Sequence, residues 1–201
     1  MQDSWIRAAR SVLGEEQIRM DEPMSAHTTF RIGGPADLFL EPRKEQVGPL
    51  LAALRKTDIP LMILGNGSDL LVGDKGIRGA VIHIGNEMDQ IGINGEQIEA
   101  QAGAPLSRVA RQAQRAGLSG MEALSGIPGS LGGAVMMNAG AYGSTMEDVI
   151  ASVEVLTEGG EIRNYSLGEM HFSYRHSRIR EEGSVVLSAV LRLKRGEAGE
   201  I

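Results

Sequence analysis

The segment "SGIPGSLGGAVMMNAGAYGS", residues 125–144, decides how this sequence is interpreted. It holds six glycines, three alanines and one proline, and it has no charged side chain. Its first part predicts a tight turn and then a short helix that begins near Gly129 or Ser130. A helix N-terminus has unpaired N–H groups and partial positive charge, so it can bind phosphate without a cationic side chain. Because no arginine or lysine occurs between Arg115 and Arg163, backbone dipoles would have to hold an anion here.

The same glycines have a second interpretation, in which small residues let a short helix pack closely on a sheet. We expect this for Gly133 and Ala134. Four glycines in the eight residues from Gly126 to Gly133 are unfavourable in a helix, by roughly 1 kcal/mol each relative to alanine, so they need a compensating role. In the following "NAGAYG", Asn138 could cap the helix or bond to a ligand, and Tyr142 could be a core residue or a site residue.

A second glycine-rich loop, "LGNGSDLLVGDKG", covers residues 64–76. It begins like a dinucleotide-binding fingerprint, but Leu70 stands where the third glycine belongs and a strand arrives by Ala80 without a helix. Neither loop contains the Gly-Lys pair of a P-loop. The loop is therefore either a set of amides that converge on an anion or a surface hairpin or Ω-loop that needs glycine for geometry. Two such loops in separate lobes favour one shared ligand, a pyrophosphate.

Hydrophobic periodicity predicts an α+β chain of two lobes. The first lobe is a βαβ unit, with an N-terminal helix over 4–19, a strand over 36–42, a helix over 44–58 and strands over 60–65 and 79–85. The second has hairpins that turn at Asn94-Gly95 and Gly159-Gly160, a helix over 104–117 and a last strand over 183–195, which we expect to be buried on both faces. The predicted division is an N-terminal helix and connector (1–30), a first lobe (31–86) and a second lobe (87–201).

Composition excludes several classes of protein. The 201 residues include no cysteine, so neither disulfides nor thiolate metal sites can form. The net charge of −6, with no basic stripe, argues against nucleic acid or an anionic membrane as partner. The four histidines have no metal-site spacing and no G-x-S-x-G elbow occurs, so we expect neither a metal centre nor a serine hydrolase. With neither a signal core nor a membrane-length apolar run, we expect a cytoplasmic protein. We also expect a monomer.

Five motifs give the chain a family resemblance that runs from about His27 onward. "HTTFRIGGPA", "LGNGSDLLV", "AGAPLSRVA", "GIPGSLGGAVMMNAGAYG" and "FSYRHS", in this order and spacing, resemble the UDP-N-acetylenolpyruvoylglucosamine reductases, also called UDP-N-acetylmuramate dehydrogenases. The resemblance implies the two-lobed FAD-binding module of the vanillyl-alcohol oxidase type. It also implies an enzyme that uses NADPH to reduce FAD and passes hydride to the enolpyruvyl group of a UDP-sugar. The product, UDP-N-acetylmuramate, is a cytoplasmic precursor of peptidoglycan.

The resemblance also assigns site residues. Those it implies for FAD are Gly65, Asn66, Gly67, Ser68, Asp69, Leu70, Gly103, Ser125, Gly126, Ile127, Pro128, Gly129, Ser130, Gly132, Gly133, Asn138, Ala139, Gly140, Ala141, Tyr142 and Val186. Arg175 matches the family's substrate-facing arginine, and Tyr174 beside it would also bind substrate. Hydride addition builds negative charge on the enolpyruvyl carboxylate, which a fixed guanidinium would stabilise. Without the motif, Arg175 would be interpreted as one solvated arginine among several basic residues.

The sequence departs from the family in two motifs. The family's proton-donating serine lies in a "GSFFKNP"-like motif and a catalytic glutamate lies near the family's C-terminus, and neither motif occurs here. We therefore expect the FAD-binding part of such a reductase, without the C-terminal substrate domain and incomplete for turnover. The alternatives are a flavin-binding module without chemistry and a flavoprotein of the same fold that acts on another substrate.

Overall fold

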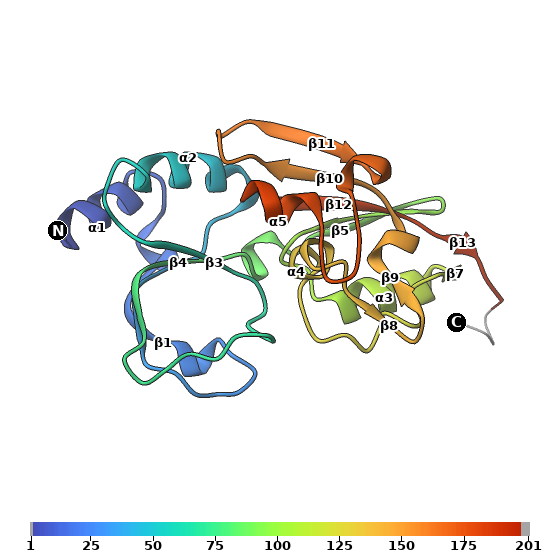
Figure 1. Ribbon diagram of the computed structural model, residues 1–201, viewed down its shortest axis with the longest axis horizontal. Coiled ribbons are helices and arrows are strands. Elements are labelled where there is room, and N and C mark those ends of the chain that lie inside the picture. The colour runs from blue at the N-terminus through green and yellow to red at the C-terminus, as the bar shows by residue number, and fades with distance from the viewer. Residues whose placement is uncertain (1, 198–201) are drawn as a thin grey trace. The chain divides into compact units, whose positions relative to one another are not determined.

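A computed structural model describes residues 2–197 of the chain, and it divides into two compact units after Glu87 (Figure 1). The boundary predicted after residue 86 lies one residue before this division, and the described residues of the predicted N-terminal connector, 2–30, belong to the first unit. None of the helices in the described part of the chain has the length and apolar character that a membrane crossing requires.

The first unit is built on a four-stranded sheet in the order β1-β2-β4-β3. Its strands are β1 (Ile18–Pro23), β2 (Pro35–Leu40), β3 (Leu61–Leu64) and β4 (Ile77–His83). The strands β2, β4 and β3 are parallel, and β1 is an antiparallel edge strand. Helix α2 (Lys44–Leu54) joins β2 to β3, and helix α1 (Gln2–Arg10) packs against α2. The structure therefore contains the βαβ unit that the sequence predicts.

The predicted helix over residues 4–19 is wrong in its second half. The helix ends at Arg10, a 3-10 turn η1 (Glu15–Gln17) follows, and the chain then forms β1. This strand is mostly exposed, so it has no apolar alternation that a sequence pattern could reveal. Backbone pairing with β2 forms it instead, and Gln17 anchors its start by donating from Nε2 to the Glu41 carbonyl at 2.8 Å.

The glycine-rich residues 65–76 connect two parallel neighbours, β3 and β4, without a helix. The alternative of a surface hairpin is therefore wrong, because a hairpin joins antiparallel strands. Residues 65–70 leave the carboxyl end of β3, and the rest of the connection returns to the amino end of β4.

The second unit is built on a five-stranded antiparallel sheet in the order β11-β10-β12-β6-β5. Its strands are β5 (Ile91–Asn94), β6 (Gln97–Gln101), β10 (Ile150–Leu156), β11 (Ile162–Ser166) and β12 (Val185–Arg192). The central strand β12 is buried from Val185 to Ala189 and at Leu191, which confirms the prediction of burial on both faces.

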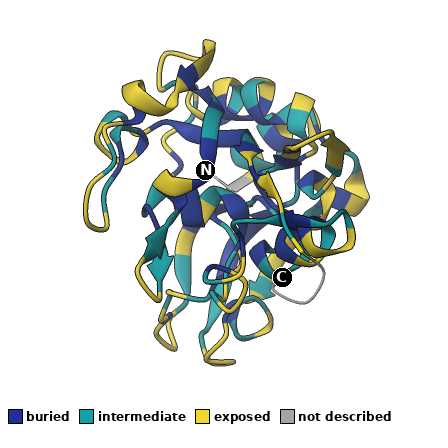
Figure 2. Cartoon of the chain, turned by 90° about the vertical axis from the view of Figure 1, so that its right-hand side faces the viewer, coloured by how far each residue is buried: buried dark blue, intermediate teal, exposed yellow. Residues whose placement is uncertain are grey.

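Short helices and ribbons complete the second unit. Helices α3 (Leu106–Arg115) and α4 (Leu131–Met136) pack on β6, α4 also packs on β12, and α5 (Arg178–Glu182) contacts α4. The two-stranded ribbons pair β7 (Leu118–Ser119) with β13 (Lys194–Arg195) and β8 (Gly140–Ala141) with β9 (Ser144–Thr145). The remaining 3-10 turns are η2 (Met24–Ala26), η3 (Asn86–Met88), η4 (Met146–Asp148) and η5 (Leu167–Met170). Figure 2 shows buried residues gathered on the strands and exposed residues on the loops.

Candidate functional site

The first glycine-rich loop, residues 65–70, is held by a neighbouring segment of its own unit. The Thr29 amide donates to the Gly67 carbonyl at 3.1 Å. Gly67 has φ +61°, and a Cβ atom there would lie 1.9 Å from the His27 carbonyl oxygen, so the chain itself requires glycine. Among the described residues, the exposed Asn66 and Asp69 find no acceptor for their backbone amides.

The second loop, Ser125–Ser130, is fixed by backbone bonds on both sides of Ser130. The Leu106 amide donates to the Gly129 carbonyl at 2.9 Å, and the Leu131 amide donates to the Ala104 carbonyl at 2.9 Å. Within residues 2–197, the amides of Gly126, Gly129 and Ser130 have no acceptor. Three unpaired donors therefore lie in a segment that has no charged side chain.

Helix α4 does not supply the free donors that a helix N-terminus was predicted to provide. It begins at Leu131 after the N-cap Ser130, and the Leu131 and Gly132 amides already donate to the carbonyls of Ala104 and Ala102. The third amide, of Gly133, donates to the Ser130 Oγ atom at 3.4 Å. The donors available to an anion lie instead in the loop before the helix.

The glycines of this segment differ in what a side chain at their position would contact. A Cβ atom at Gly132 would lie 2.9 Å from the Ala102 Cβ atom, so this glycine allows close packing. The packing role predicted for Gly133 is wrong: it is exposed, and its Cβ would meet only the Ser130 Oγ atom, at 3.5 Å. Ala134 is buried as predicted. A Cβ at Gly126 would have no neighbour within 4 Å, so the chain leaves backbone uncovered at Gly126 and Gly133.

These features fit a diphosphate-containing cofactor such as FAD. Unpaired amides can donate to phosphate oxygens, and uncovered glycine backbone permits a ligand to approach closely. Leu70 is half-buried and packs on a cluster of the first unit's core. Gly103, Ala139 and Val186 are buried, so they could meet a ligand mainly through backbone. Gly67 and Ser130 are also buried, and the other residues of the two loops are exposed or half-buried, among them Gly65, Ser68, Ser125, Ile127 and Pro128.

A pocket of about 470 Å³ in the second unit brings six of the predicted site residues together. Its lining consists of Asn138, Gly140, Ala141, Tyr142, Gly143, Ser144, Thr145, Glu147, Ser173, Tyr174 and Arg175. Tyr142 is 94% exposed and Tyr174 is 92% exposed, so the interpretation of Tyr142 as a core residue is wrong. The Arg175 guanidinium carbon lies 6.0 Å from the centre of the Tyr174 ring.

The backbone of this pocket is strained and braced. Asn138, Tyr142 and Arg175 all have left-handed φ angles, of 41°, 51° and 53°. Such conformations in residues other than glycine cost about 1–3 kcal/mol and gather at functional sites. The Asn138 side chain donates to the Ser173 carbonyl at 3.1 Å and accepts from the Glu147 amide at 3.0 Å. It therefore joins three walls of the pocket, which supports a bracing role.

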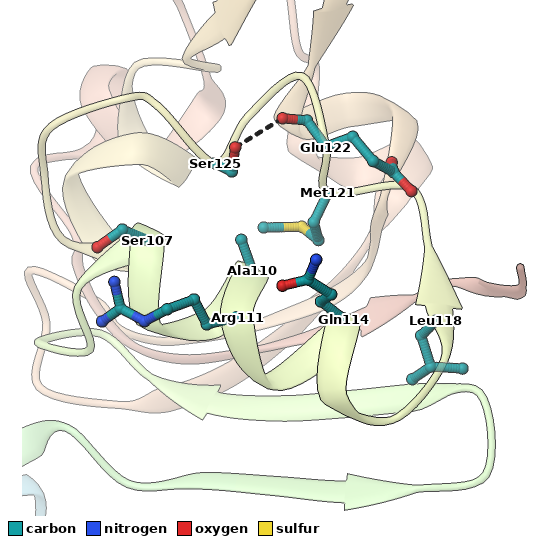
Figure 3. A pocket seen from close by; sticks show the side chains of 8 residues that line it. All are labelled: Ser107, Ala110, Arg111, Gln114, Leu118, Met121, Glu122 and Ser125. Carbon is teal, nitrogen blue, oxygen red and sulfur yellow. Dashed lines mark hydrogen bonds between the residues drawn. The ribbon is translucent and has the colours of Figure 1, made fainter. Parts of the chain in front are cut away.

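A second pocket of the same unit, of about 360 Å³, was not predicted (Figure 3). Side chains of Ser107, Ala110, Arg111 and Gln114 from α3 face Leu118, Met121, Glu122 and Ser125 of the following segment. The Ser125 hydroxyl donates to the Glu122 carbonyl at 2.7 Å, which ties the pocket to the second loop. Burial would raise the pKa of Glu122, but hydrogen bonds with the backbone, including the Gly120 amide, and with Ser119 lower it. Ordinary amphipathic spacing on α3 gave no sign of this pocket.

Comparison with known proteins identifies the family. The family model described as an FAD binding domain matches residues 36–166. A UDP-N-acetylenolpyruvoylglucosamine reductase from Agathobacter rectalis is 46% identical over 96% of this chain and 65% of its own length. One from Heliobacterium modesticaldum is 48% identical over 90% of this chain and 58% of its own length. The chain thus spans somewhat less than two thirds of the curated relatives it matches.

Solved structures agree on the fold. UDP-N-acetylenolpyruvylglucosamine reductase from Thermus caldophilus superposes with a TM-score of 0.76 at 35% identity, covering 91% of this chain and 64% of that one. An alkyldihydroxyacetonephosphate synthase, 18% identical over 95% of this chain and 40% of its own, has a TM-score of 0.71 and shows the fold alone. The predicted two-lobed fold of the vanillyl-alcohol oxidase type and the predicted cofactor FAD are confirmed. Because its family model matches more than half of the sequence, the chain belongs to the FAD binding domain family.

Proposed function

We propose that this chain is the FAD-binding part of an NADPH-dependent UDP-N-acetylenolpyruvoylglucosamine reductase, an oxidoreductase of peptidoglycan precursor synthesis. The observation that carries the proposal is the set of unpaired amides at Gly126, Gly129 and Ser130 in a segment without cationic side chains. Identities of 46% and 48% with reductases of that name support the choice of substrate. We expect a small-molecule partner, a monomer and a cytoplasmic reaction.

Each loop, among the described residues of its own unit, has unpaired backbone donors of the kind that a diphosphate needs. The amides of Asn66 and Asp69 in one loop, and of Gly126, Gly129 and Ser130 in the other, would each donate to a phosphate oxygen. Hydrogen bonds to an ionised acceptor are about twice as strong as neutral ones, so a few amides can replace a lysine. When bound, FAD supplies the hydride-transfer chemistry, and the protein supplies placement and electrostatics.

The pocket around Arg175 fits the carboxylate of an enolpyruvyl substrate. Arg175 is exposed at the pocket and forms no ion pair with any described residue. A guanidinium there would bind the carboxylate through paired hydrogen bonds and would stabilise the negative charge that grows on it as hydride adds to the enol ether. The exposed rings of Tyr142 and Tyr174 offer flat surfaces and hydroxyl groups to the same ligand.

FAD uptake tests the cofactor half of the proposal. We expect the purified chain to take up FAD at close to one equivalent, with a visible flavin band that NADPH bleaches under anaerobic conditions. Gly126→Val is expected to weaken FAD binding at least about tenfold, or about 1.4 kcal/mol, because its side chain would cover the open backbone. Gly168→Val is the matched control, since Gly168 is an exposed glycine of the same unit with no neighbour within 4 Å of a Cβ atom.

A protein that remains colourless with excess FAD contradicts the proposal, and so does equal FAD affinity in the two glycine variants.

Arg175→Met is expected to leave FAD affinity unchanged while weakening binding of the enolpyruvyl UDP-sugar. If the unsubstituted chain binds FAD but no such sugar, a flavoprotein that acts on another substrate becomes the better description. Because the motif of the proton-donating serine does not occur in the 201 residues, we propose that this chain alone gives little or no product.

A further inference from the structure

The first unit contains a connected chain of ionisable side chains that no part of the proposed chemistry uses. We call it the His27 cluster, and it consists of Arg19, Glu22, His27, Glu41 and His83. His27 Nε2 lies 2.8 Å from Glu22 Oε1, and Arg19 bridges Glu22 at 3.2 Å and Glu41 at 2.7 Å. His83 Nδ1 lies 3.1 Å from Glu41 Oε1 and ends this chain of contacts.

The His27 cluster surrounds Phe39, which is fully buried in β2. The His27 ring stacks on Phe39 with 4.0 Å between ring centres, and the His83 ring lies 5.2 Å away. Only 13% of the His27 side chain is exposed. His27 is therefore fixed by a hydrogen bond at its Nε2 atom and by an aromatic ring against its face.

The backbone of His27 touches the first glycine-rich loop. Its carbonyl oxygen is the atom that a Cβ at Gly67 would meet at 1.9 Å, and the Thr28 Cα atom is 3.2 Å from the same point. Two residues beyond His27, the Thr29 amide donates to the Gly67 carbonyl. Residues 27–29 thus lie against Gly67. In the sequence, Gly67 stands between Asn66 and Asp69, the two residues with unpaired amides. A displacement of His27 would move those donors.

We propose that His27 is a positioning residue for the first glycine-rich loop. Its imidazole, held between Glu22 and Phe39, fixes the His27 carbonyl and the Thr29 amide against Gly67, and this contact holds the loop amides in place for the cofactor's diphosphate. His27 acts through the backbone and not by touching FAD. The inference rests on the proposed function for the loop.

The charges of the His27 cluster support a firm anchor. Burial alone would raise the pKa of Glu22, but hydrogen bonds from His27 and Arg19 outweigh it and lower that pKa below its ordinary value. Glu22 is therefore ionised at neutral pH, and the bond from His27 is charge-assisted in either protonation state of the ring. Burial lowers the pKa of His83, against the effect of Glu41, so His83 is neutral at pH 7.

The experiment compares variants of His27 with two measurements. The first is hydrogen exchange of the Thr29 amide, which reports the contact with Gly67 without any cofactor. The second is the dissociation constant of FAD. We expect His27→Ala to speed exchange at Thr29 at least about tenfold and to weaken FAD binding by a similar factor, about 1.4 kcal/mol. Exchange of the Leu106 amide, which holds the second loop, is expected to stay unchanged.

Conservative variants separate positioning from a general loss of structure. His27→Gln retains a donor that can reach Glu22 and is expected to recover most of both losses. His27→Phe keeps the stacking but not the donor, and we expect an intermediate effect. Arg43→Ala, which removes an exposed ion pair with Glu87 in the same unit, is the control and is expected to change neither measurement.

The results that would overturn the inference are specific. Unchanged exchange at Thr29 in His27→Ala, or equal losses in His27→Gln and His27→Ala, would exclude positioning through this side chain. If His27→Ala does not fold, Glu22→Ala, which removes the acceptor of the His27 hydrogen bond, must still speed exchange at Thr29, and unchanged exchange there overturns the inference. An unsubstituted chain that takes up no FAD would defeat the proposed function, while exchange at Thr29 would still decide the role of His27.

Discussion

Gly67 of the first glycine-rich loop and Gly126 of the second differ in what requires a glycine there. In the first loop, Gly67 has a left-handed φ of +61° and presses against the His27 carbonyl, so the chain demands glycine whether or not a ligand is present. In the second loop, a side chain at Gly126 would point into open space. A glycine that the fold needs is no evidence for a ligand. One that the fold does not need is a better indication of where a ligand lies close to the backbone.

In both loops, a carbonyl group is hydrogen-bonded within residues 2–197 while some N–H groups are not. The carbonyls of Gly67 and Gly129 accept hydrogen bonds from Thr29 and Leu106. In the described part of the chain, N–H groups on these same loops remain unpaired. Pairing the acceptors within the protein while the donors stay unpaired gives a backbone suited to an anion. The phosphate binding that we propose would therefore follow the same principle in both loops, although Gly67 and Gly126 are glycines for different reasons.

Gly67→Ala offers the largest effect that could break this comparison. An alanine would carry the cost of a left-handed conformation, about 1–2 kcal/mol, and a clash with backbone in addition. We expect a loss of about 2–4 kcal/mol in the free energy of unfolding, measured by urea denaturation.

The control for Gly67→Ala lies in the same connection. Gly73 has no neighbour within 4 Å of a Cβ atom and no left-handed φ. Gly73→Ala is therefore expected to change the free energy of unfolding by less than about 0.5 kcal/mol. Equal losses in the two variants would show that the first loop does not depend on the contact with His27.

Adjacent glycines in α4 give a comparison of intermediate size. Gly132→Ala would force a Cβ atom to within 2.9 Å of the Ala102 Cβ atom, and we expect a loss of about 1–2 kcal/mol. Gly133→Ala has room, and it is expected to stabilise the cofactor-free protein by about 0.5–1 kcal/mol because alanine favours the helix. Chemical denaturation of both variants measures these changes, and a stabilising effect at Gly132 would contradict the packing contact.

The sequence predicted the sheets better than it predicted the reasons for individual glycines. Apolar periodicity identified the βαβ unit and the buried strand β12, because those elements bury side chains. It missed β1, which is held by backbone pairing and by Gln17. It assigned packing to Gly133 when Gly132 makes the contact, because neighbouring glycines are indistinguishable without the position of Ala102.

Residues of the candidate site could be predicted only where they belong to a motif of the resembling family. The family resemblance named Tyr142, Tyr174 and Arg175, which line one pocket. The His27 cluster was missed because its members come from β1, β4 and two loops, and no local spacing connects them. The free donors were expected at the start of α4, but the first amides of α4 donate to the carbonyls of Ala102 and Ala104. The free donors therefore lie in the loop before α4. Local sequence cannot predict these bonds, because Ala102 and Ala104 are distant in the chain.

The pH dependence of stability is expected to come partly from the first unit, because the ionisable His27 cluster lies there. Burial lowers the pKa of His83 below its ordinary value, so in that pH range the unfolded chain binds more protons than the folded one. Stability is therefore expected to fall as the pH drops through about 6.5. His83→Asn, which can keep a donor near Glu41, is expected to reduce this slope in urea unfolding at pH 7.5 and 5.5. An unchanged slope would contradict the assignment to His83.

The smallest expected effect concerns Ser130, at the border between the second loop and α4. Its Oγ atom is 3.4 Å from the Gly133 amide, a long bond, so Ser130→Ala is expected to cost only about 0.5 kcal/mol of stability. If the backbone amide of residue 130 is the group that donates to phosphate, this variant retains the donor, and FAD affinity is expected to change by less than about twofold, or about 0.4 kcal/mol. A tenfold loss would instead show that the hydroxyl contacts the cofactor, and the second loop would then bind its anion partly through a side chain.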